Sequence, residues 1–401
     1  MLFALLAICI FFHIVTNGIF LSPENITVLV RQSSIVGVLA IGMVLVIVSG
    51  NIDLSVGSLV GLTGGMAAIF SVNDGMSLPF AIFLTMIFGI AIGAAQGFLV
   101  AYMRVPAFIV TLGGLLIFRG AISAWMQGKT IPVSIDFNFI GGGFLNTTSG
   151  IIAGTLAVIY STWFNISKLR AKKLHGIETK SSLFSWVNIL GTFVLISFFL
   201  FVFHANETEN LKAPISGMIN LPSSSPLFHE SITHPSNQII NQSHDSRSIP
   251  VPVIIMILLA LIFTFISNKT IFGRRIFAIG GNAETAFLSG INVKRNTLFV
   301  FALMGLMSAI AGIIYTARVG SAAPDAAKGY ELYAIAACVI GGTSLSGGKG
   351  TIFGAIIGAL IMSSLDSGMS IMNVDSFYQD IIKGAVLIAA VYLDVAGRKN
   401  K

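Results

Sequence analysis

Charged residues are scarce in this chain. Only 10% of its 401 residues are Asp, Glu, Lys or Arg, whereas 55% are hydrophobic. A soluble domain carries about 25% charged residues, so this composition excludes a chain that covers itself with a water-facing surface. The apolar residues also occur in blocks close to the ~20 residues that a helix needs to cross a bilayer. We therefore expect an all-α, polytopic membrane helix bundle.

Cysteine and catalytic motifs are equally sparse. Cys9 and Cys338 lie far apart in apolar runs, which argues against a disulfide framework or a metal site. The sequence contains no HExxH motif and no Ser/His/Asp or paired-carboxylate arrangement that would support an intramembrane enzyme. The glycine-rich stretch 342–350 departs from the phosphate-binding loop, with Thr343 and Gly350 where that motif requires Gly and Ser or Thr. We expect neither ATP nor any cofactor on this chain.

Apolar segments divide the chain into candidate membrane crossings. They lie at about residues 1–20, 35–50, 55–70, 80–102, 107–126, 151–167, 184–203, 252–267, 297–317, 332–345, 351–372 and 380–396. The first lacks the basic region and cleavage site of a signal peptide, so it is interpreted as a crossing. Short, glycine-interrupted segments in transporters often mark broken helices around a binding site. We predict one transmembrane domain, residues 1–401, with about 10–12 crossings, some of them broken or re-entrant.

The positive charges indicate which loops face the cytoplasm. Basic residues gather in the loops 168–183 and 268–296 and in the C-terminal tail, and the positive-inside rule places all three in the cytoplasm. Parity then puts both termini inside and the stretch 204–250 outside. This stretch is rich in Ser, Asn and Pro and lacks apolar periodicity, which predicts a poorly ordered polar loop. It holds four of the six histidines, whose irregular spacing favours a solvated loop over a metal site.

Two stretches of the chain echo each other. Residues 50–57 and 341–348 are both polar, glycine-containing turns between an apolar segment and a glycine-rich one, and each is later followed by a V-x-x-F step, at 105–108 and 374–377. Internal repeats are a recurrent way to build transporters, with substrate handled at the repeat interface. We therefore predict an internal repeat whose turns border the transport pathway.

Polar residues inside apolar segments are the candidate pathway residues. Asp53 has two readings: a carboxylate lining a cavity at membrane depth, or, like Ser55, a cap for the following helix. Arg119 and Lys383 either serve a pathway or extend to the membrane interface, while Gln96 and Asp366 suit hydrogen bonds to sugar hydroxyls. The candidate pathway residues are Asn51, Asp53, Ser55, Ser58, Gln96, Thr111, Arg119, Ser346 and Asp366.

Three motifs together resemble one known family. Residues 52–58 (IDLSVGS), 105–112 (VPAFIVTL) and 340–348 (IGGTSLSGG) are similar to signature segments of the ribose/xylose/galactose permeases of ABC importers, in the same order along nearly the whole chain. The extra apolar pair around the 168–180 loop and the segment 364–372 resemble xylose permeases in particular. The resemblance therefore implies D-xylose as the substrate.

The second basic loop resembles the family's ATPase-coupling loop. Its relaxed E-A-A-x-x-x-G pattern is matched by Glu284, Ala286 and Gly290, whereas Thr285 departs where Ala is usual. We expect a short helix from Glu284 to Ser289 that stops at Gly290 and docks into a partner. The candidate coupling residues are Gly281, Asn282, Glu284, Ala286 and Gly290.

The resemblance also implies an assembly. Two permease copies would form a homodimer around one pathway in the lipid of a bacterial inner (plasma) membrane. Two cytoplasmic ATPase subunits would carry ATP and Mg, and a soluble periplasmic or extracellular sugar-binding protein would dock outside. No nucleic acid partner is expected. The alternatives are an ABC permease for another sugar, for branched-chain amino acids or for nucleosides, and an ion-coupled secondary transporter.

Overall fold

The computed structural model describes residues 2–144 and 249–399. Residues 1–143 and 250–401 belong to one compact unit. The predicted crossings at 151–167 and 184–203 and the loop 168–183 lie outside the described residues, as does all but the end of the loop 204–250. The described elements are α1 (Leu2–Val15), η1 (Ile19–Leu21), α2 (Pro23–Val48), α3 (Val56–Ala68), the π-helix η2 (Ile69–Asn73), α4 (Leu78–Ala101), α5 (Ala107–Trp125), β1 (Ile131–Pro132), α6 (Ile135–Gly142), α11 (Val251–Lys269), α12 (Ile271–Gly281), α13 (Ala283–Leu288), α14 (Val293–Val319), β2 (Ser321–Ala322), α15 (Tyr330–Ile340), α16 (Ile352–Ile371) and α17 (Ser376–Lys399).

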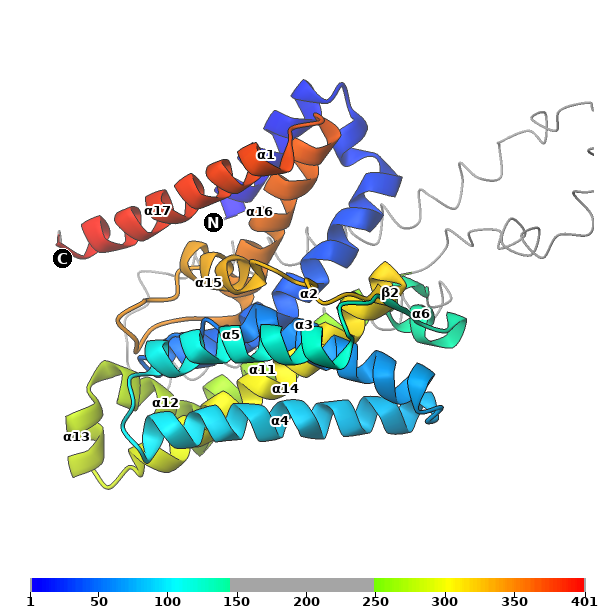
Figure 1. Ribbon diagram of the computed structural model, residues 1–401. Helices are drawn as coiled ribbons and strands as arrows, with labels where there is room; N and C mark the ends of the chain where they lie inside the picture. The colour runs from blue at the N-terminus through cyan, green and yellow to red at the C-terminus, as the bar shows by residue number, and fades with distance from the viewer. Residues whose placement is uncertain (1, 145–248, 400–401) are drawn as a thin grey trace, which may run out of the picture. The chain divides into compact units, whose positions relative to one another are not determined.

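Helices long and apolar enough to cross a membrane dominate the described unit (Figure 1). Within the described residues there are seven of them, namely α2, α3 with η2, α4, α5, α11, α14 and α16, and α1 and α15 are shorter apolar helices. The only strands in this part of the chain are β1 and β2, which form a two-residue antiparallel ladder. The expectation of an all-α, multi-pass membrane bundle is confirmed.

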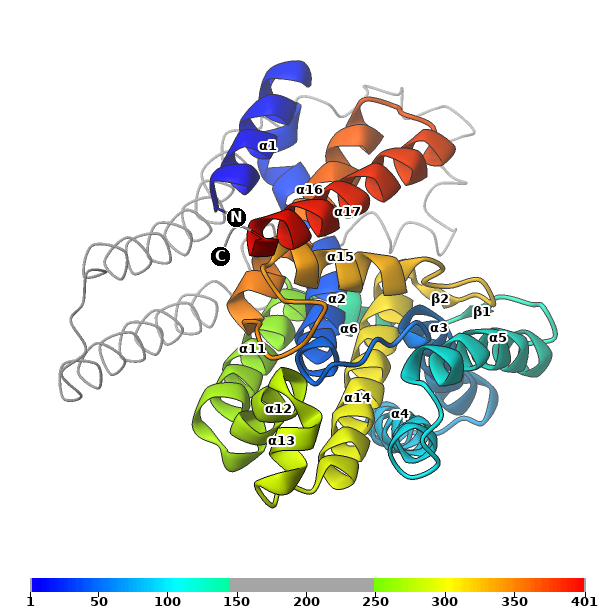
Figure 2. The ribbon, with the colours of Figure 1, turned by 90° about the vertical axis from the view of Figure 1, so that its left-hand side faces the viewer.

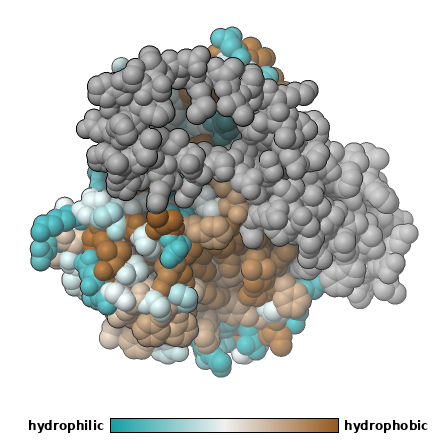
Figure 3. All heavy atoms as spheres, turned by 90° about the vertical axis from the view of Figure 1, so that its right-hand side faces the viewer, coloured by the Kyte–Doolittle hydropathy of each residue, from teal (hydrophilic) through white to brown (hydrophobic). Residues whose placement is uncertain are grey.

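The apolar helices divide into an inner and an outer group. The apolar windows of α2, α14 and α16 are 89%, 72% and 72% buried, whereas those of α4, α5 and α11 are only 22%, 17% and 28% buried. A helix that is apolar on all sides needs protein or lipid around it. The exposed apolar faces of the outer helices, part of which forms the brown surface in Figure 3, therefore suit contact with lipid tails.

Small residues let α4 and α14 pack with their backbones nearly touching. A methyl group on Gly93 of α4 would overlap the Phe301 carbonyl oxygen and lie 3.0 Å from the Gly305 Cα of α14. Close approach at small residues is the usual way for helices to associate in membranes, where the hydrophobic effect contributes little. The pair therefore depends on glycine at this crossing.

Helix α2 begins well before the predicted segment 35–50. Its first half carries Arg31 and Gln32, polar side chains that an apolar-segment search excludes. The structure gives both of them partners: Arg31 donates to the Gly141 carbonyl at 3.0 Å, and Gln32 donates to the Asp366 carboxylate. Polar groups are tolerated inside a bundle when they are paired in this way.

A broken segment connects α14 to α16. After α14, residues 320–329 are largely non-helical, and α15 then has only 11 residues. An 11-residue helix is about 16 Å long, roughly half of the ~30 Å hydrocarbon core. Arg119 of α5 donates to the Pro324 and Ala326 carbonyls at 3.1 and 2.8 Å, which satisfies backbone acceptors that a helix would otherwise pair internally.

Replacing Gly93 with alanine is expected to lower the stability of the purified protein by about 1–3 kcal/mol, because the added methyl group forces α4 away from α14. Gly120→Ala is the matched control, since nothing lies within 4 Å of its added methyl group and alanine favours a helix over glycine by about 1 kcal/mol. Thermal unfolding in detergent measures both. Equal melting temperatures for the two variants would contradict this packing.

Candidate functional site

The two echoed turns meet at one glycine of the coupling loop. The Gly348 amide, in the turn before α16, donates to the carbonyl of Val48 at the end of α2, at 2.9 Å. A methyl group on Gly280 of α12 would overlap that same Val48 carbonyl and lie 2.7 Å from the Gly348 nitrogen. We call Val48, Gly280, Gly347 and Gly348 the glycine junction. It brings the backbones of three elements into direct contact.

The two V-x-x-F steps do not occupy equivalent places. Residues 105–108 follow α4, two crossings after the first turn, whereas residues 374–377 follow α16, one crossing after the second turn. The first step also lies near its own turn, where Thr111 Oγ1 is 3.4 Å from the Ile52 carbonyl. In the structure the internal similarity therefore extends to the turns and not to these steps.

A short helix forms in the predicted coupling loop. Asn282 caps α13, its Oδ1 accepting from the Thr285 amide at 2.9 Å, as short polar side chains do at helix starts. Gly290 has a φ of +80°, in the left-handed region that glycine adopts without strain. The predicted helix over residues 284–289 is present within one residue at each end, and Gly290 follows it as expected.

Helix α13 presents apolar side chains to the outside. Ala286 is buried against the bundle, while Glu284 is exposed, and Phe287 and Leu288 are 67% and 78% exposed. Figure 2 shows α13 beside α12 and the start of α14, at an end of the bundle. Two large exposed side chains on a capped helix form a small apolar surface suited to a partner.

A polar cluster surrounds Asp53, in the turn between α2 and α3. Its Oδ1 accepts from the Ser55 amide at 2.8 Å and from the Ser55 hydroxyl at 2.6 Å, and Gln96 of α4 donates to that hydroxyl at 3.0 Å. Thr111 of α5 and Ser58 of α3 are also buried. Ser58 is three residues after Ser55 in the sequence, and Thr111 Oγ1 lies 3.4 Å from the Ile52 carbonyl. Asn51 instead bonds within its own turn, to Ser49.

The capping interpretation of this cluster is wrong. Ser55 precedes the first residue of α3 but makes no side-chain cap hydrogen bond. Asp53 accepts from Ser55 itself, two residues on, which is the local bond that stabilises an Asx turn. Asp53 therefore shapes the turn between α2 and α3, at only 1% exposure.

The predicted pathway residues are not all in one place. Arg119 holds the segment after α14, and Ser346 lies in the turn before α16, where its hydroxyl is 3.0 Å from that of Ser344. Asp366 belongs to a third location, a cavity between α2, α15, α16 and α17. Lys383 does not extend to the membrane interface and instead pairs with Asp366 at 3.0 Å.

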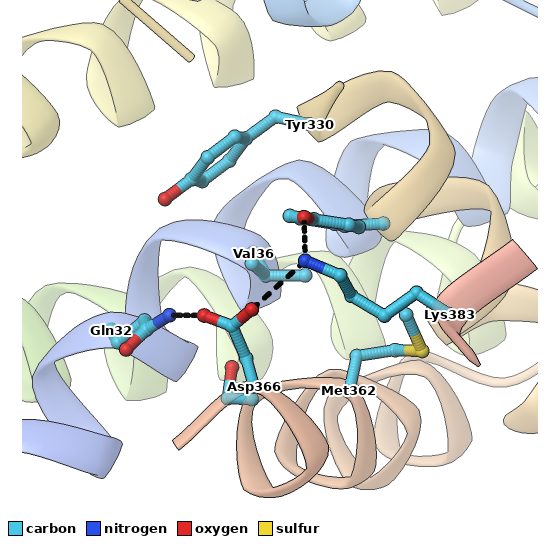
Figure 4. A pocket seen from close by; sticks show the side chains of 8 residues that line it. Gln32, Val36, Tyr330, Met362, Asp366 and Lys383 are labelled. Atoms are coloured by element: carbon cyan, nitrogen blue, oxygen red, sulfur yellow. Dashed lines mark hydrogen bonds and ion pairs between the residues drawn. The ribbon is translucent and has the colours of Figure 1, made fainter. Parts of the chain in front are cut away.

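Sequence reasoning missed most of this cavity. Its lining also includes Gln32, Tyr330, Tyr333 and Ser363 (Figure 4). Gln32 was missed because the first half of α2 was not recognised as helical. Ser363 lies three residues before Asp366, and this helical spacing is a signal in the sequence that the two share a face.

Removing the Asp53 carboxylate tests the turn. Asp53→Ala leaves the buried Ser55 amide and hydroxyl without their acceptor, which is expected to cost about 1–3 kcal/mol of stability. Asp53→Asn keeps an oxygen in the same position and should lose less. The two variants are compared by thermal unfolding in detergent, and equal losses would show that the acceptor oxygen is not what holds the turn.

Comparisons with known proteins cover nearly the whole chain. Residues 25–391 match the family described as "Branched-chain amino acid transport system / permease component". The xylose transport system permease protein XylH of Haemophilus influenzae is 42% identical over 409 residues, covering 100% of this chain and 96% of the relative. XylH of Escherichia coli strain K12 is 43% identical over 402 residues (100% and 92%), and the ribose import permease protein RbsC of that strain is 33% identical over 396 residues (98% and 92%). No solved structure matches the chain. The chain therefore belongs to this family of transport-system permease components.

Proposed function

We propose that this chain is the transmembrane permease subunit of an ATP-driven ABC importer that carries D-xylose into the cytoplasm. The observation that carries the proposal is the similarity of the entire chain to permeases named for xylose, at 42–43% identity. The 33% identity to ribose permeases supports a monosaccharide in the same way. The permease moves the sugar, and ATP hydrolysis belongs to a separate subunit.

The proposed function requires an assembly with other proteins. A cytoplasmic ATPase subunit, holding ATP and Mg, binds α13, where Phe287 and Leu288 offer an exposed apolar contact. A second permease copy completes the pathway, and a soluble sugar-binding protein docks at the opposite side. This arrangement places both termini in the cytoplasm of a bacterial cell and the chain in its plasma membrane.

The glycine junction suggests how ATP binding reaches the pathway. α13 follows α12 with only Asn282 between them, and α12 ends in Gly280 and Gly281. Gly280 lies against the end of α2 and the turn before α16 with no side chain in between. A displacement of α13 therefore shifts these backbones together. ATP drives the switch only because the two states of the permease bind the ATPase differently.

A branched-chain amino acid is the second candidate substrate, because the matching family is described by that substrate. The two candidates are separated by reconstituting the chain with an ATPase and a binding protein from its own transport system, and measuring the uptake of radioactive D-xylose and leucine. We expect ATP-dependent uptake of D-xylose alone. Uptake of leucine in its place, or uptake of xylose without the ATPase, would contradict the proposed function.

The contact with the ATPase is tested on α13. Leu288→Ser is expected to weaken ATPase binding about tenfold, the effect of losing roughly 1.4 kcal/mol, whereas Leu288→Met keeps the apolar contact and should bind as the wild type does.

Glu284→Lys and Gly290→Val should uncouple ATP hydrolysis from sugar uptake, the first by reversing a charge on the docking surface, the second by straining a left-handed backbone. If ATP hydrolysis and uptake stay coupled in both Glu284→Lys and Gly290→Val, the assignment of this segment as the coupling loop is wrong.

The junction is tested separately from docking. Gly280→Ala is expected to reduce xylose uptake strongly while ATPase binding persists, because its methyl group overlaps the Val48 carbonyl. Gly281→Ala should have a smaller effect, since open space surrounds that position. Uptake and ATPase binding are measured on the same reconstituted preparations. Equal uptake by the two variants would show that the close approach at Gly280 is not required.

A further inference from the structure

The cavity between α2, α15, α16 and α17 combines charged, hydroxyl and aromatic groups inside a membrane bundle. Its lining residues are Gln32, Val36, Tyr330, Tyr333, Met362, Ser363, Asp366 and Lys383. They come from α2 and from the consecutive helices α15, α16 and α17, and Figure 4 shows Gln32, Asp366 and Lys383 pointing toward one another. Charged groups inside a membrane bundle are energetically unfavourable, and where they occur they often mark a substrate pathway. Ligand-binding pockets typically have a few polar groups among apolar walls.

The charged residues of the cavity hold one another. Lys383 donates to the Asp366 carboxylate at 3.0 Å and to the Tyr333 hydroxyl at 2.5 Å. The Gln32 amide donates to the second oxygen of Asp366. The lysine side chain is 9% exposed and the aspartate side chain 23%. These groups offer the donors and acceptors that a polyhydroxyl ligand takes up.

One hydroxyl in the cavity has no partner. Ser363 is 3% exposed, and its Oγ makes no hydrogen bond within the described part of the chain. A buried hydroxyl left unpaired is unfavourable, and in the lining of a cavity this one is free to bond a group that arrives from outside the protein. Asp366 follows Ser363 by three residues on α16, so the two side chains share one face of that helix.

Aromatic rings complete the lining. The rings of Tyr330 and Tyr333 lie 5.4 Å apart at their centroids, and Val36 and Met362 supply apolar contacts. A sugar presents hydroxyls at its rim and C–H groups on its ring faces. Aromatic faces with a polar tip suit both, whereas an amino acid with a branched apolar side chain would need a larger apolar pocket.

We propose that this cavity is a pentose-binding station of the transport pathway, in which Ser363, Asp366 and Gln32 hydrogen-bond sugar hydroxyls and Tyr330 lies against the ring. The inference rests on the proposed function and locates its substrate on this chain. In the present structure the cavity has room for one water molecule at most. A pentose therefore enters only when the surrounding helices move apart.

Lys383 has a second carboxylate partner that it keeps when it leaves Asp366 and the cavity opens. Besides Asp366, it pairs with Asp380 of its own helix at 3.1 Å, and the Asp380 side chain is 75% exposed. When sugar hydroxyls replace the ammonium group at Asp366, Lys383 keeps a carboxylate partner at Asp380. The lysine therefore stays paired, while the Asp366 carboxylate keeps the hydrogen bond from Gln32 and gains those of the sugar hydroxyls. These hydrogen bonds offset part of the cost of separating a buried ion pair.

The test uses the complete reconstituted importer and two serines that are alike except in position. Ser363→Ala is expected to lower the maximal rate of D-xylose uptake about tenfold, as the loss of one well-made hydrogen bond does, while ATP hydrolysis stimulated by the binding protein is unchanged. Ser308→Ala is the control, because Ser308 is equally buried and its hydroxyl equally unpartnered but it does not line the cavity. It should transport as the wild type does.

A second substrate distinguishes the loss of a sugar contact from a purely structural effect. Asp366→Asn should also slow uptake at unchanged ATP hydrolysis, and a deoxyxylose that lacks the hydroxyl bound by Ser363 should be insensitive to Ser363→Ala, since the two changes remove one contact. The station is overturned if Ser363→Ala transports at the wild-type rate, or if it slows every deoxyxylose as much as xylose. A wild type that carries no pentose would instead overturn the proposed function, and this inference with it.

Discussion

The structure depends on a contact between backbones at Gly280. Because no side chain separates this residue from Val48 or from the turn before α16, the three elements cannot slide past one another by a change of rotamer. Packed interiors respond to such constraints by moving as units. The loop that carries α13 is therefore tied mechanically to two of the most buried helices of the bundle, α2 and α16.

The same two helices reach the cavity. Gln32 lies sixteen residues before Val48 on α2, about 24 Å away at 1.5 Å per residue, and α16 runs beside α2 from the junction to Asp366. The proposed mechanism requires that a shift at the junction be carried along this pair of helices to the cavity. Packed elements couple two sites in this way when they have two discrete arrangements that both sites bias.

Local signals in the sequence predicted the local structure. Apolar blocks located most of the crossings, and Gly290 placed the end of α13 because a left-handed turn at a helix end depends on a single residue. The cavity could not be predicted in this way. Its partners Gln32 and Asp366 are 334 positions apart, and Gln32 itself, with Arg31, kept the first half of α2 from being recognised as an apolar segment.

Transmission from the ATPase to the cavity is the central claim, and a distance between spin labels tests it most directly. One label replaces Ile381 on the exposed face of α17, two positions before Lys383, and the other replaces Leu116 on the exposed face of α5. The distance is measured in the complete importer with and without a non-hydrolysable nucleotide. Nucleotide is predicted to shift the distance distribution in the wild type and to leave it unchanged in Gly280→Ala. A distribution that does not respond in the wild type, or that responds equally in both proteins, would contradict the account.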